Sequence, residues 1–287
     1  MPELPEVEIV KRSLQKSVYL RKILKVKVNN RNLRYKVDKN FEKKLKGKKI
    51  LNISRKAKYI TISLDNYTFF CIHLGMSGTL HIVKNNFENK KTNLSFYHSP
   101  VLGKKHNHLI FYFKDFKIIY NDPRRFGFIK IFENKRTFNN YFSRNGCEPL
   151  SKNLNLEYLK KKLNLSKKSI KNVLLDQKII SGIGNIYASE ILFHSKIRPN
   201  RLVNSLNQKE ISNMIISTKF ILNKAIRKGG SSIRDFKNSD GNTGTFQNEF
   251  KVYNKENENC PNSSCKNKIK KLNISNRSTF YCNICQK

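Results

Sequence analysis

The residues with the clearest chemical potential stand at the start of the chain, where positions 1–8 read MPELPEVE. A small residue after Met1 permits removal of the methionine, which would leave Pro2 with a free secondary amine. An α-amine has a pKa of about 7.7–8.0, so part of it is neutral and nucleophilic near neutral pH. Such an amine can attack an aldehyde carbon to give an iminium ion, and the carboxylate of Glu3 can move protons beside it. The alternative is that Glu6 and Glu8 only match a helix dipole.

A second chemical cluster lies in the last 28 residues. Cys260 and Cys265 are separated by four residues, and sixteen residues later Cys282 and Cys285 are separated by two. Two close pairs at this distance are typical of four thiolates around one structural zinc ion. Two disulfides are the alternative, but nothing in the sequence suggests an oxidising compartment, and the other two cysteines are isolated.

The charge of the chain points to its partner. Lys plus Arg is 58 against 20 for Asp plus Glu, so the formal net charge is +38. A surface this basic favours a polyanion, although Lys and Asn are enriched almost everywhere and part of the excess is compositional drift. No apolar run approaches the roughly 18 residues of a membrane span, so we expect no membrane association.

Alternating apolar and polar residues predict strands in the first part of the chain. Segments 58–64, 68–74, 109–113 and 116–120 alternate and are joined by short turns, which is typical of an antiparallel sandwich or barrel. A helix is predicted before them, because apolar residues recur at helical spacing with Pro5 near the first turn; these are Val7, Val10, Leu14 and Val18.

From about Ser151 the period becomes helical. A long helix is predicted between Ile211 and Ile226, with a capping box at Ser205 and Gln208 and a stop at Gly229-Gly230. Shorter helices are predicted near 156–165, 167–180 and 185–195. We therefore expect a multidomain α+β protein with four parts: a catalytic β-sandwich domain (1–132), a hinge or linker (133–150), a helical domain (151–248) and a zinc-finger hairpin (249–287).

Several motifs together resemble the bacterial formamidopyrimidine-DNA glycosylases. In order along the chain they are MPELPEVE at 1–8, AKY at 57–59, HLGMSG at 73–78, DPRRFG at 122–127, GIGNIYASE at 182–190 and the terminal cysteines. The resemblance implies an N-terminal β-sandwich, a helix-two-turn-helix domain and a zinc hairpin. It also implies base excision repair: a glycosylase that excises 8-oxoguanine and formamidopyrimidines from duplex DNA through an imine on the N-terminal proline, followed by β,δ-elimination as an apurinic/apyrimidinic-site lyase.

The resemblance also implies roles for individual residues. Pro2 would be the nucleophile at the deoxyribose C1′, Glu3 the acid–base group, and Glu6 a support of the damaged nucleotide's pocket. The remaining positions would act on DNA. Lys58, which is grouped with the catalytic residues, would contact phosphates, as would His73 and Arg277, and Asn185 would hold the phosphate beside the lesion. Lys171 would lie near the damaged base, and the space that the flipped base vacates would be filled by Met76, Arg124 and Phe126. The segment 235–247 would close over the flipped base.

Some of these residues also have simpler structural interpretations, and the chain differs from the family pattern in its cysteine spacing. Met76 and Phe126 could be ordinary core residues, Asn185 could be a helix N-cap, and segment 235–247 could be a surface loop without function. The family usually has two residues between its first two cysteines, and this chain has four, which leaves the placement of Arg277 open.

Two other functions compete with the first. One is the sister endonuclease VIII type, which shares the fold and the nucleophile but prefers oxidised pyrimidines. The other is a non-catalytic nucleic-acid-binding protein with a zinc finger. We expect a monomeric, cytoplasmic bacterial enzyme that associates with the nucleoid by binding DNA.

Overall fold

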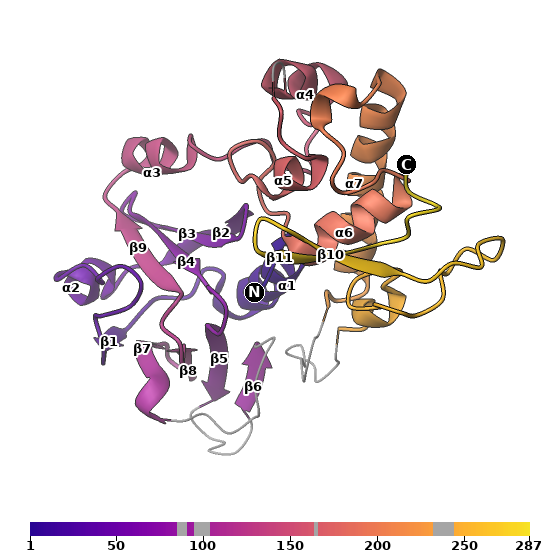
Figure 1. The fold of residues 1–287 in the computed structure, drawn as a ribbon. Helices are drawn as coiled ribbons and strands as arrows, with labels where there is room; N and C mark the ends of the chain where they lie inside the picture. Colours follow the sequence, from indigo (N-terminus) through magenta and orange to yellow (C-terminus); the bar gives the residue numbers. More distant parts are fainter. Residues whose placement is uncertain (85–90, 95–103, 164–165, 232–243) are drawn as a thin grey trace. The chain divides into compact units, whose positions relative to one another are not determined.

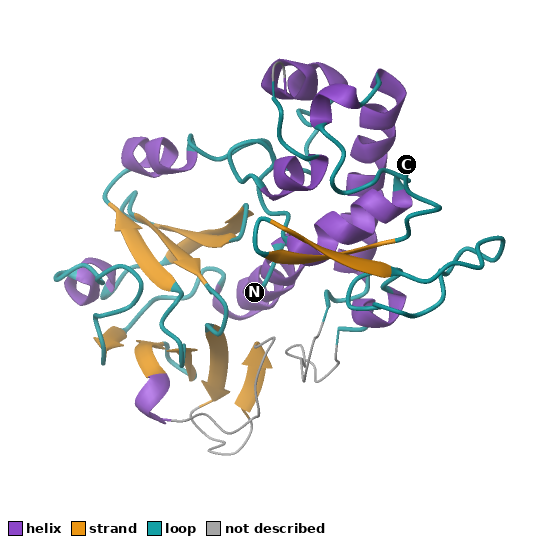
Figure 2. Cartoon of the chain, viewed as in Figure 1, coloured by secondary structure: helices purple, strands orange, loops and turns teal. Residues whose placement is uncertain are grey.

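The computed structural model describes residues 1–84, 91–94, 104–163, 166–231 and 244–287 (Figures 1 and 2). The chain divides into two compact units: residues 1–143 with 228–247, and residues 144–227 with 248–287. This grouping differs from the four parts expected from the sequence. The segment expected as a linker contains a helix, α3 (Lys135–Phe142), and the end of the expected helical domain belongs to the first unit.

The first unit is built on two antiparallel sheets. A five-stranded sheet has the order β1-β7-β8-β5-β6, and a four-stranded sheet has the order β2-β3-β4-β9. The strands are β1 (Lys25–Val28), β2 (Ile50–Lys56), β3 (Tyr59–Leu64), β4 (Phe69–His73), β5 (Thr79–Lys84), β6 (Lys91–Leu94), β7 (Asn107–Tyr112), β8 (Phe116–Asn121) and β9 (Phe128–Phe132). The four strands predicted from alternation correspond to β3, β4, β7 and β8, and the sandwich prediction is confirmed.

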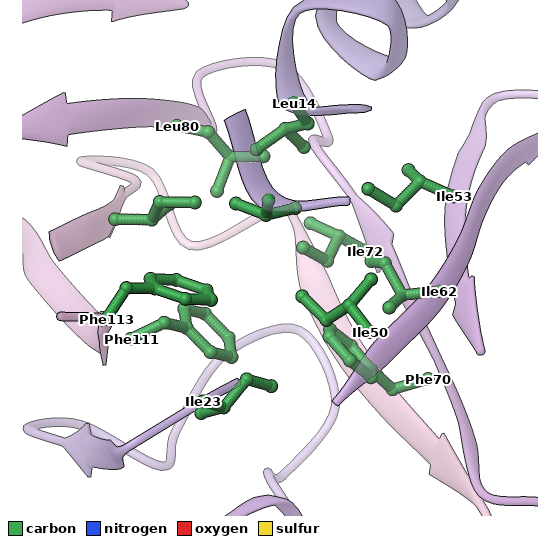
Figure 3. A pocket seen from close by; sticks show the side chains of 12 residues that line it. Leu14, Ile23, Ile50, Ile53, Ile62, Phe70, Ile72, Leu80, Phe111 and Phe113 are labelled. Carbon is green, nitrogen blue, oxygen red and sulfur yellow. The ribbon is translucent and has the colours of Figure 1, made fainter. Parts of the chain in front are cut away.

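One continuous apolar core joins the two sheets. Phe70 of β4 stacks on Phe111 of β7, with ring centroids 6.0 Å apart. A small, wholly apolar cavity of about 30 Å³ lies in this core, lined by side chains from both sheets and by Leu14 (Figure 3). This volume is about that of one water, and a cavity without polar partners stays dry. The sheets are therefore held together by dispersion and by burial of apolar surface.

Helix α1 (Leu4–Val18) covers part of this core, as the sequence predicts. Glu3 is the N-cap residue and forms a capping box with Glu6, and a proline stands in the first turn. Its buried face carries the four predicted valine and leucine positions and packs against β2 and β3. The apolar spacing and the cap together explain why the helix begins at Leu4.

Helix α3 begins where Asn134 accepts a hydrogen bond from the backbone N–H of Thr137. Its two buried aromatic residues, Phe138 and Phe142, pack on Phe132 of β9. Alternation and turn signals end before this segment, so its aromatic spacing is the only sequence signal for a helix there. A short helix, α2 (Phe41–Leu45), and a 3-10 turn, η1 (Lys104–His106), complete the first unit.

The second unit is helical and ends in a two-stranded hairpin. Its elements are α4 (Leu156–Leu163), α5 (Ile170–Leu175), α6 (Asn185–His194), η2 (Val203–Ser205), α7 (Gln208–Arg227), β10 (Lys270–Ile274) and β11 (Arg277–Tyr281); the 3-10 turn η3 (Phe246–Glu249) lies where the two units meet in sequence. The expected helix at 167–180 is shorter. It begins after the Ser169 cap and ends at Asp176, whose carboxylate accepts from the backbone N–H of Lys178 in a turn.

The start of α7 corrects one prediction. The capping box is formed by Asn207 and Glu210: the Asn207 side chain accepts from the N–H of Glu210 at 2.9 Å, and the Glu210 carboxylate accepts from the N–H of Asn207 at 2.9 Å. The expected residue Ser205 lies in η2 and donates to Leu202 O instead. Glu210 also pairs with Arg201 at 2.5 Å, which fixes the cap two residues later than predicted.

No helix among the described residues is long and apolar enough to cross a membrane.

Candidate active site, DNA-binding loops and metal centre

The chain is buried from its second residue onward, while Met1 itself is exposed. Pro2 is buried, and Glu3 is only 3% exposed at the N-cap of α1. Burial lowers the pKa of the terminal amine of Met1 below its ordinary value; the carboxylates of Glu3 and Glu6 oppose this effect, and the cations of Lys58 and Arg124 add to it. These are the surroundings of an amine that is partly neutral near neutral pH and has carboxylates close by. They are also the surroundings of Pro2, one residue further along.

Glu6 ties this start to a distant segment of the first unit. One carboxylate oxygen accepts from the backbone N–H of Glu3 at 2.9 Å. The other accepts from both the N–H and the hydroxyl of Ser231, each at 2.9 Å. Glu6 is therefore a capping residue and a buried anchor at the same time. Ser231 is a site residue that sequence reasoning missed, and a serine after two glycines carries no signal that could have found it.

Next to Ser231, the backbone of residues 229–230 lies close to the backbone of residues 244–246. Gly229 and Gly230 have φ of 78° and 79°, and a side chain at Gly244 would collide with their carbonyl oxygens. The backbone N–H of Phe246 donates to Gly230 O at 3.1 Å. The segment 235–247, expected to close over a flipped base, lies outside the described residues up to 243, so only its last four residues are placed.

Lys58 and His73 both belong to the four-stranded sheet, Lys58 in a turn and His73 at the end of a strand. Lys58 is 6% exposed in the two-residue turn between β2 and β3, next to Ala57 in the left-handed region at φ 52°. That conformation costs an alanine about 1–2 kcal/mol and indicates a turn held by its surroundings. His73 ends β4, and its ring stacks on Phe128 at 5.2 Å.

His73 is neutral at physiological pH. Burial, with Lys58 and Arg34 adding to it, lowers the pKa of His73 to about 4. Its Nδ1 accepts from the backbone N–H of Gly75 at 3.1 Å, so the remaining proton is on Nε2. His73 can therefore donate one hydrogen bond to an anion, but it brings no positive charge.

Met76 and Phe126 are surface residues on two loops of the first unit. Met76, between β4 and β5, is 39% exposed, and Phe126, between β8 and β9, is 42% exposed. These values exclude the reading in which they are ordinary core. The Arg124 guanidinium lies 4.6 Å from the Phe126 ring centroid. A groove of about 640 Å³ adjoins this loop, lined by Asn32, Leu33, Arg34, Arg124, Arg125 and Phe126.

In the second unit, two buried side chains converge on the hairpin. Lys171 is fully buried, and its Nζ donates to Thr279 Oγ1 at 2.5 Å and to Ser278 O at 3.2 Å. Asn185 Nδ2 donates to the same Ser278 carbonyl at 2.9 Å. Both residues therefore hold the strand that begins with Arg277, which is exposed beside the β10–β11 turn.

The N-cap alternative for Asn185 does not hold. Gly184 is the N-cap of α6, and Asn185 is the first helical residue. Its Oδ1 is buried and has no hydrogen-bond partner among the described residues.

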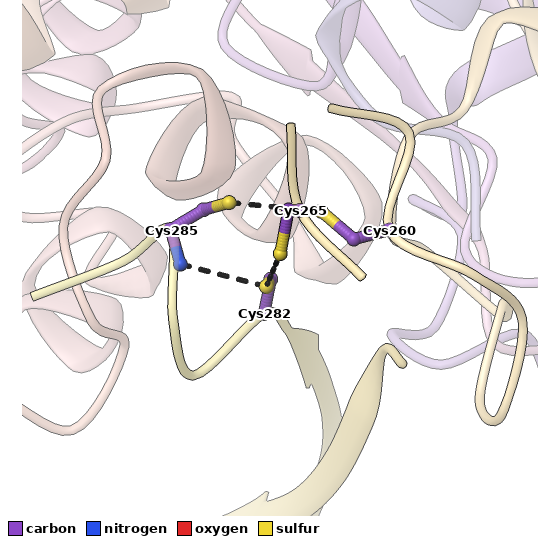
Figure 4. Close-up of side chains that lie close together, drawn as sticks. All are labelled: Cys260, Cys265, Cys282 and Cys285. Carbon is purple, nitrogen blue, oxygen red and sulfur yellow. Dashed lines mark hydrogen bonds between the residues drawn. The ribbon is translucent and has the colours of Figure 1, made fainter. Parts of the chain in front are cut away.

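The four C-terminal cysteines form one cluster (Figure 4). Their sulfur atoms all lie within 4.8 Å of one another, with 3.7 Å between Cys260 and Cys285 and between Cys265 and Cys282. A disulfide needs about 2.05 Å, so these are free thiols. A tetrahedron with metal–sulfur distances of about 2.3 Å has edges near 3.8 Å, so the cluster has the dimensions of a four-thiolate zinc site.

The four-residue spacer between Cys260 and Cys265 contributes to the cluster. Asn262, within this spacer, donates to Cys285 Sγ at 3.0 Å. The long spacer therefore remains compatible with the cluster and adds an outer hydrogen bond to one ligand.

Comparison with known proteins gives a consistent result along the whole chain. The family model described as "Formamidopyrimidine-DNA glycosylase N-terminal domain" matches residues 1–129, and the one described as "Formamidopyrimidine-DNA glycosylase H2TH domain" matches residues 146–237. The formamidopyrimidine-DNA glycosylase of Rickettsia bellii (strain OSU 85-389) is 41% identical over 288 residues, covering 100% of both chains. The chain belongs to the formamidopyrimidine-DNA glycosylase family.

Other members of this family support the assignment. The protein of the same name from Wolbachia pipientis subsp. Culex pipiens (strain wPip) is 41% identical over 287 residues, with 100% of each chain covered. A complex of Lactococcus lactis Fpg with DNA containing an abasic site has a TM-score of 0.86 at 33% identity, covering 99% of each chain. A wild-type Lactococcus lactis Fpg complex with N7-benzyl-Fapy-dG DNA has a TM-score of 0.86 at 33% identity and covers 100% of each.

Family membership establishes the fold class and the enzyme class. The protein is a base excision repair glycosylase that acts on DNA, and apurinic/apyrimidinic-site lyase activity is implied by the family. The structure gathers the expected residues in two groups. Pro2, Glu3, Glu6, Lys58 and Arg124 surround the chain start in the first unit, and Lys171, Asn185 and Arg277 meet at the hairpin in the second.

Proposed function

We propose that the chain excises oxidised purines, 8-oxoguanine and formamidopyrimidines, from duplex DNA by covalent catalysis at the amine of Pro2. The observation that supports this most directly is the lowered pKa of the buried terminal amine beside Glu3 and Glu6. Removal of Met1 gives Pro2 the free amine in these surroundings. A lysine nucleophile would need a much larger shift of its pKa to react at neutral pH.

The reaction follows from these groups. The Pro2 nitrogen attacks C1′, the glycosidic bond breaks, and the damaged base leaves with the bonding electrons and takes up a proton. Glu3 gives a proton to the sugar ring oxygen as the ring opens, which leaves an iminium ion on Pro2. The iminium acidifies the adjacent C–H, so loss of a proton expels the 3′ phosphate, and a second elimination expels the 5′ phosphate. Water then releases the sugar fragment and regenerates the amine.

We assign the remaining residues to binding. Lys58 and Arg277 bring positive charge to phosphates, while His73 through Nε2–H and Asn185 donate hydrogen bonds to them. Glu6 supports the nucleotide pocket from its position in the first turn of α1, where it is bonded to Ser231. We assign Lys171 an indirect role, because its ammonium is engaged by Ser278 and Thr279 of the hairpin.

Three other residues fill the space left by the flipped base. Met76 and Phe126 supply exposed apolar side chains, and Arg124 supplies a guanidinium that can hydrogen-bond the orphaned cytosine.

One structural zinc ion on the four cysteines completes the proposal. Zinc would supply the folding free energy that a hairpin of this size cannot obtain from its own core. We propose that the enzyme acts as a monomer. We also propose that it acts in the cytoplasm, on the nucleoid, which its bacterial relatives and its proposed DNA substrate support.

Borohydride trapping tests the nucleophile and the substrate together. The protein is incubated with 8-oxoguanine:cytosine duplex and sodium borohydride, which reduces an imine to a stable amine, and the crosslinked peptide is mapped. We expect a crosslink at Pro2. A crosslink found only with oxidised-pyrimidine duplex would instead support the endonuclease VIII type, and tight binding without any crosslink would mean a non-catalytic binder.

Two variants separate the steps. A chain that retains Met1 should lose base release and strand cleavage together, and full activity of that chain would refute the role of Pro2. Glu3→Gln should bind lesion duplex with affinity close to that of the wild type but release the base at least about a hundredfold more slowly. Normal turnover by Glu3→Gln would remove Glu3 from the mechanism.

A further inference from the structure

Asp122 is a fully buried acidic residue to which the mechanism above gives no part. It lies at 0% exposure at the end of β8, two residues before Arg124. Its two carboxylate oxygens accept from three donors that come from different segments of the first unit. A buried carboxylate that accepts several hydrogen bonds fixes the positions of the chain segments that carry its donors.

The first oxygen reaches the loop that carries Met76. Ser77 Oγ donates to Asp122 Oδ1 at 2.5 Å, and Ser77 is itself 3% exposed. The same hydroxyl accepts from the backbone N–H of Arg124 at 3.2 Å. One serine side chain therefore connects the Met76 loop to both the carboxylate and the backbone of the Arg124 loop.

The second oxygen closes the other loop on itself. Asp122 Oδ2 accepts from the backbone N–H of Gly127 at 2.8 Å and from the Tyr120 hydroxyl at 3.2 Å. Between Asp122 and Gly127, Arg125 has a backbone in the left-handed region at φ 54°. This conformation persists only when its surroundings hold it. Arg124 and Phe126 thus stand on a turn bonded at both ends to one carboxylate.

The two loops also touch directly. Gly75 has φ of 61°, and any side chain there would collide with the backbone of Phe126 and Gly127. A side chain at Gly127 would collide with the Tyr120 hydroxyl. The glycines therefore permit a backbone-to-backbone contact that the Asp122–Ser77 bonds then hold in register.

We propose that Asp122 and Ser77 are positioning residues that join the two loops into one preformed unit, so that Met76, Arg124 and Phe126 enter the DNA together. This inference rests on the proposed function, in which these side chains fill the vacated space. Loops ordered in advance lose little conformational entropy when they enter the duplex. The Arg124 guanidinium is also held at a fixed place relative to the base opposite the lesion, which makes Ser77 a determinant of opposite-base specificity.

Ser77→Ala tests this coupling, because it removes both bonds of the hydroxyl and adds no bulk. The readout is the single-turnover rate of base release at saturating enzyme, with cytosine or adenine opposite 8-oxoguanine. We expect release from the cytosine duplex to fall about tenfold and the preference for cytosine to shrink. Cleavage of a single-stranded abasic oligonucleotide, in which no vacated space has to be filled, should stay within about twofold of the wild type.

Thr79→Val is the matched control. Thr79 is 2% exposed. Its hydroxyl bonds to His81 of the same strand, β5, and to Asn121 O of the adjoining strand, β8, without linking the two loops. The Thr79→Val variant should lose about as much thermal stability as Ser77→Ala. Its ratio of the duplex rate to the abasic rate should stay at the wild-type value. Tyr120→Phe removes one donor to Asp122 and should shift the ratio in the same direction as Ser77→Ala, by less; it also provides the test if Ser77→Ala does not fold.

The outcomes separate the two proposals. Equal losses on duplex and abasic substrates would make Ser77 a general stability residue and overturn the coupling, as would an unchanged duplex rate. A wild-type protein that forms no borohydride crosslink would refute the proposed function itself, whatever the variants do.

Discussion

At the scale of single residues, the surroundings decide what a side chain can do. A histidine can bind phosphate as a cation, but the buried ring of His73 beside Lys58 and Arg34 is neutral. Its Nδ1 accepts a hydrogen bond from the backbone N–H of Gly75. Two positive neighbours already provide charge at that place. At the proposed phosphate site, a neutral donor would add direction without adding to the repulsion among the cations.

This state of His73 predicts a specific pH dependence. With a pKa of about 4 in the folded protein and about 6.5 in the unfolded chain, only the unfolded state binds the extra proton between these values. The free energy of unfolding should therefore fall as the pH drops from about 6.5 toward 4, and this part of the loss should be absent in His73→Gln. Urea unfolding at pH 7 and pH 4.5 should show the gap between the two proteins narrowing by roughly 2 kcal/mol. A constant gap would mean that His73 titrates normally.

At the scale of elements, the hairpin β10–β11 depends on side chains from the helices of its own unit. Lys171 of α5 and Asn185 of α6 both donate to Ser278 O, and the Glu190 carboxylate of α6 accepts from three consecutive backbone N–H groups at residues 251–253. The cysteines fix one end of this module, and these buried polar groups fix the other. The placement of Arg277 is therefore controlled from both ends.

Replacing Lys171 tests this support. Lys171→Met keeps most of the side-chain volume but removes the bonds to Ser278 and Thr279, so we expect about tenfold weaker binding of lesion duplex with the metal still bound. Lys168→Met is the control, because Lys168 stands three residues earlier, is mostly exposed and pairs with Asp176 on the surface. Fluorescence anisotropy with both variants gives the comparison. Equal affinities would show that the hairpin keeps its place without Lys171.

Removing the metal tests the other end of the hairpin. Chelation of zinc, or Cys282→Ser, should weaken DNA binding at least tenfold while the β-sandwich unit keeps its circular dichroism signal and its thermal transition. Cys147→Ser changes a cysteine of the same unit outside the cluster and should leave both properties unchanged. Metal content measured by a thiol-displacement assay would accompany the binding curves. Unaltered affinity after complete loss of metal would refute the structural role of zinc.

At the scale of the whole molecule, a net charge of +38 favours binding to DNA, whose strength should fall as salt is added. Each cation that neutralises a phosphate releases counterions, so the logarithm of the affinity falls linearly with the logarithm of the salt concentration. Charge alone gives no lesion specificity, which has to come from contacts with the bases.

The slope of this dependence reports individual contacts. Lys58 and Arg277 together predict a slope at least as steep as about −1.8, and Arg277→Gln should reduce it by about 1 for lesion duplex and undamaged duplex alike. Arg21→Gln, beyond the far end of α1 and paired on the surface with Asp115, should leave the slope unchanged. Titrations at several salt concentrations measure it. An identical slope for Arg277→Gln would remove Arg277 from the phosphate contacts.

Much of this architecture follows from local patterns, and the rest depends on distant contacts. Alternation predicts β3, β4, β7 and β8, and apolar spacing predicts α1 and α7, because each pattern marks the face that an element buries. The cap of α7 was placed wrongly at Ser205, because Ser205 with Gln208 and Asn207 with Glu210 show the same local pattern, and spacing alone does not choose between them. Neither the Glu6–Ser231 contact nor the Ser77–Asp122 bond has a local signature, because their partners are 225 and 45 residues apart.

The Glu6–Ser231 contact has a consequence for how the protein is made. Ribosomes add about 5–20 residues per second, so Ser231 is synthesised roughly 10–45 s after Glu6. During that interval the strands of the first unit can already pair, while one oxygen of the Glu6 carboxylate lacks its native partner. A nascent or prematurely terminated chain therefore has the proposed nucleophile without the completed contacts of Glu6. If Pro2 and Glu6 act as proposed, the enzyme becomes competent to cut DNA only when most of its chain has been translated.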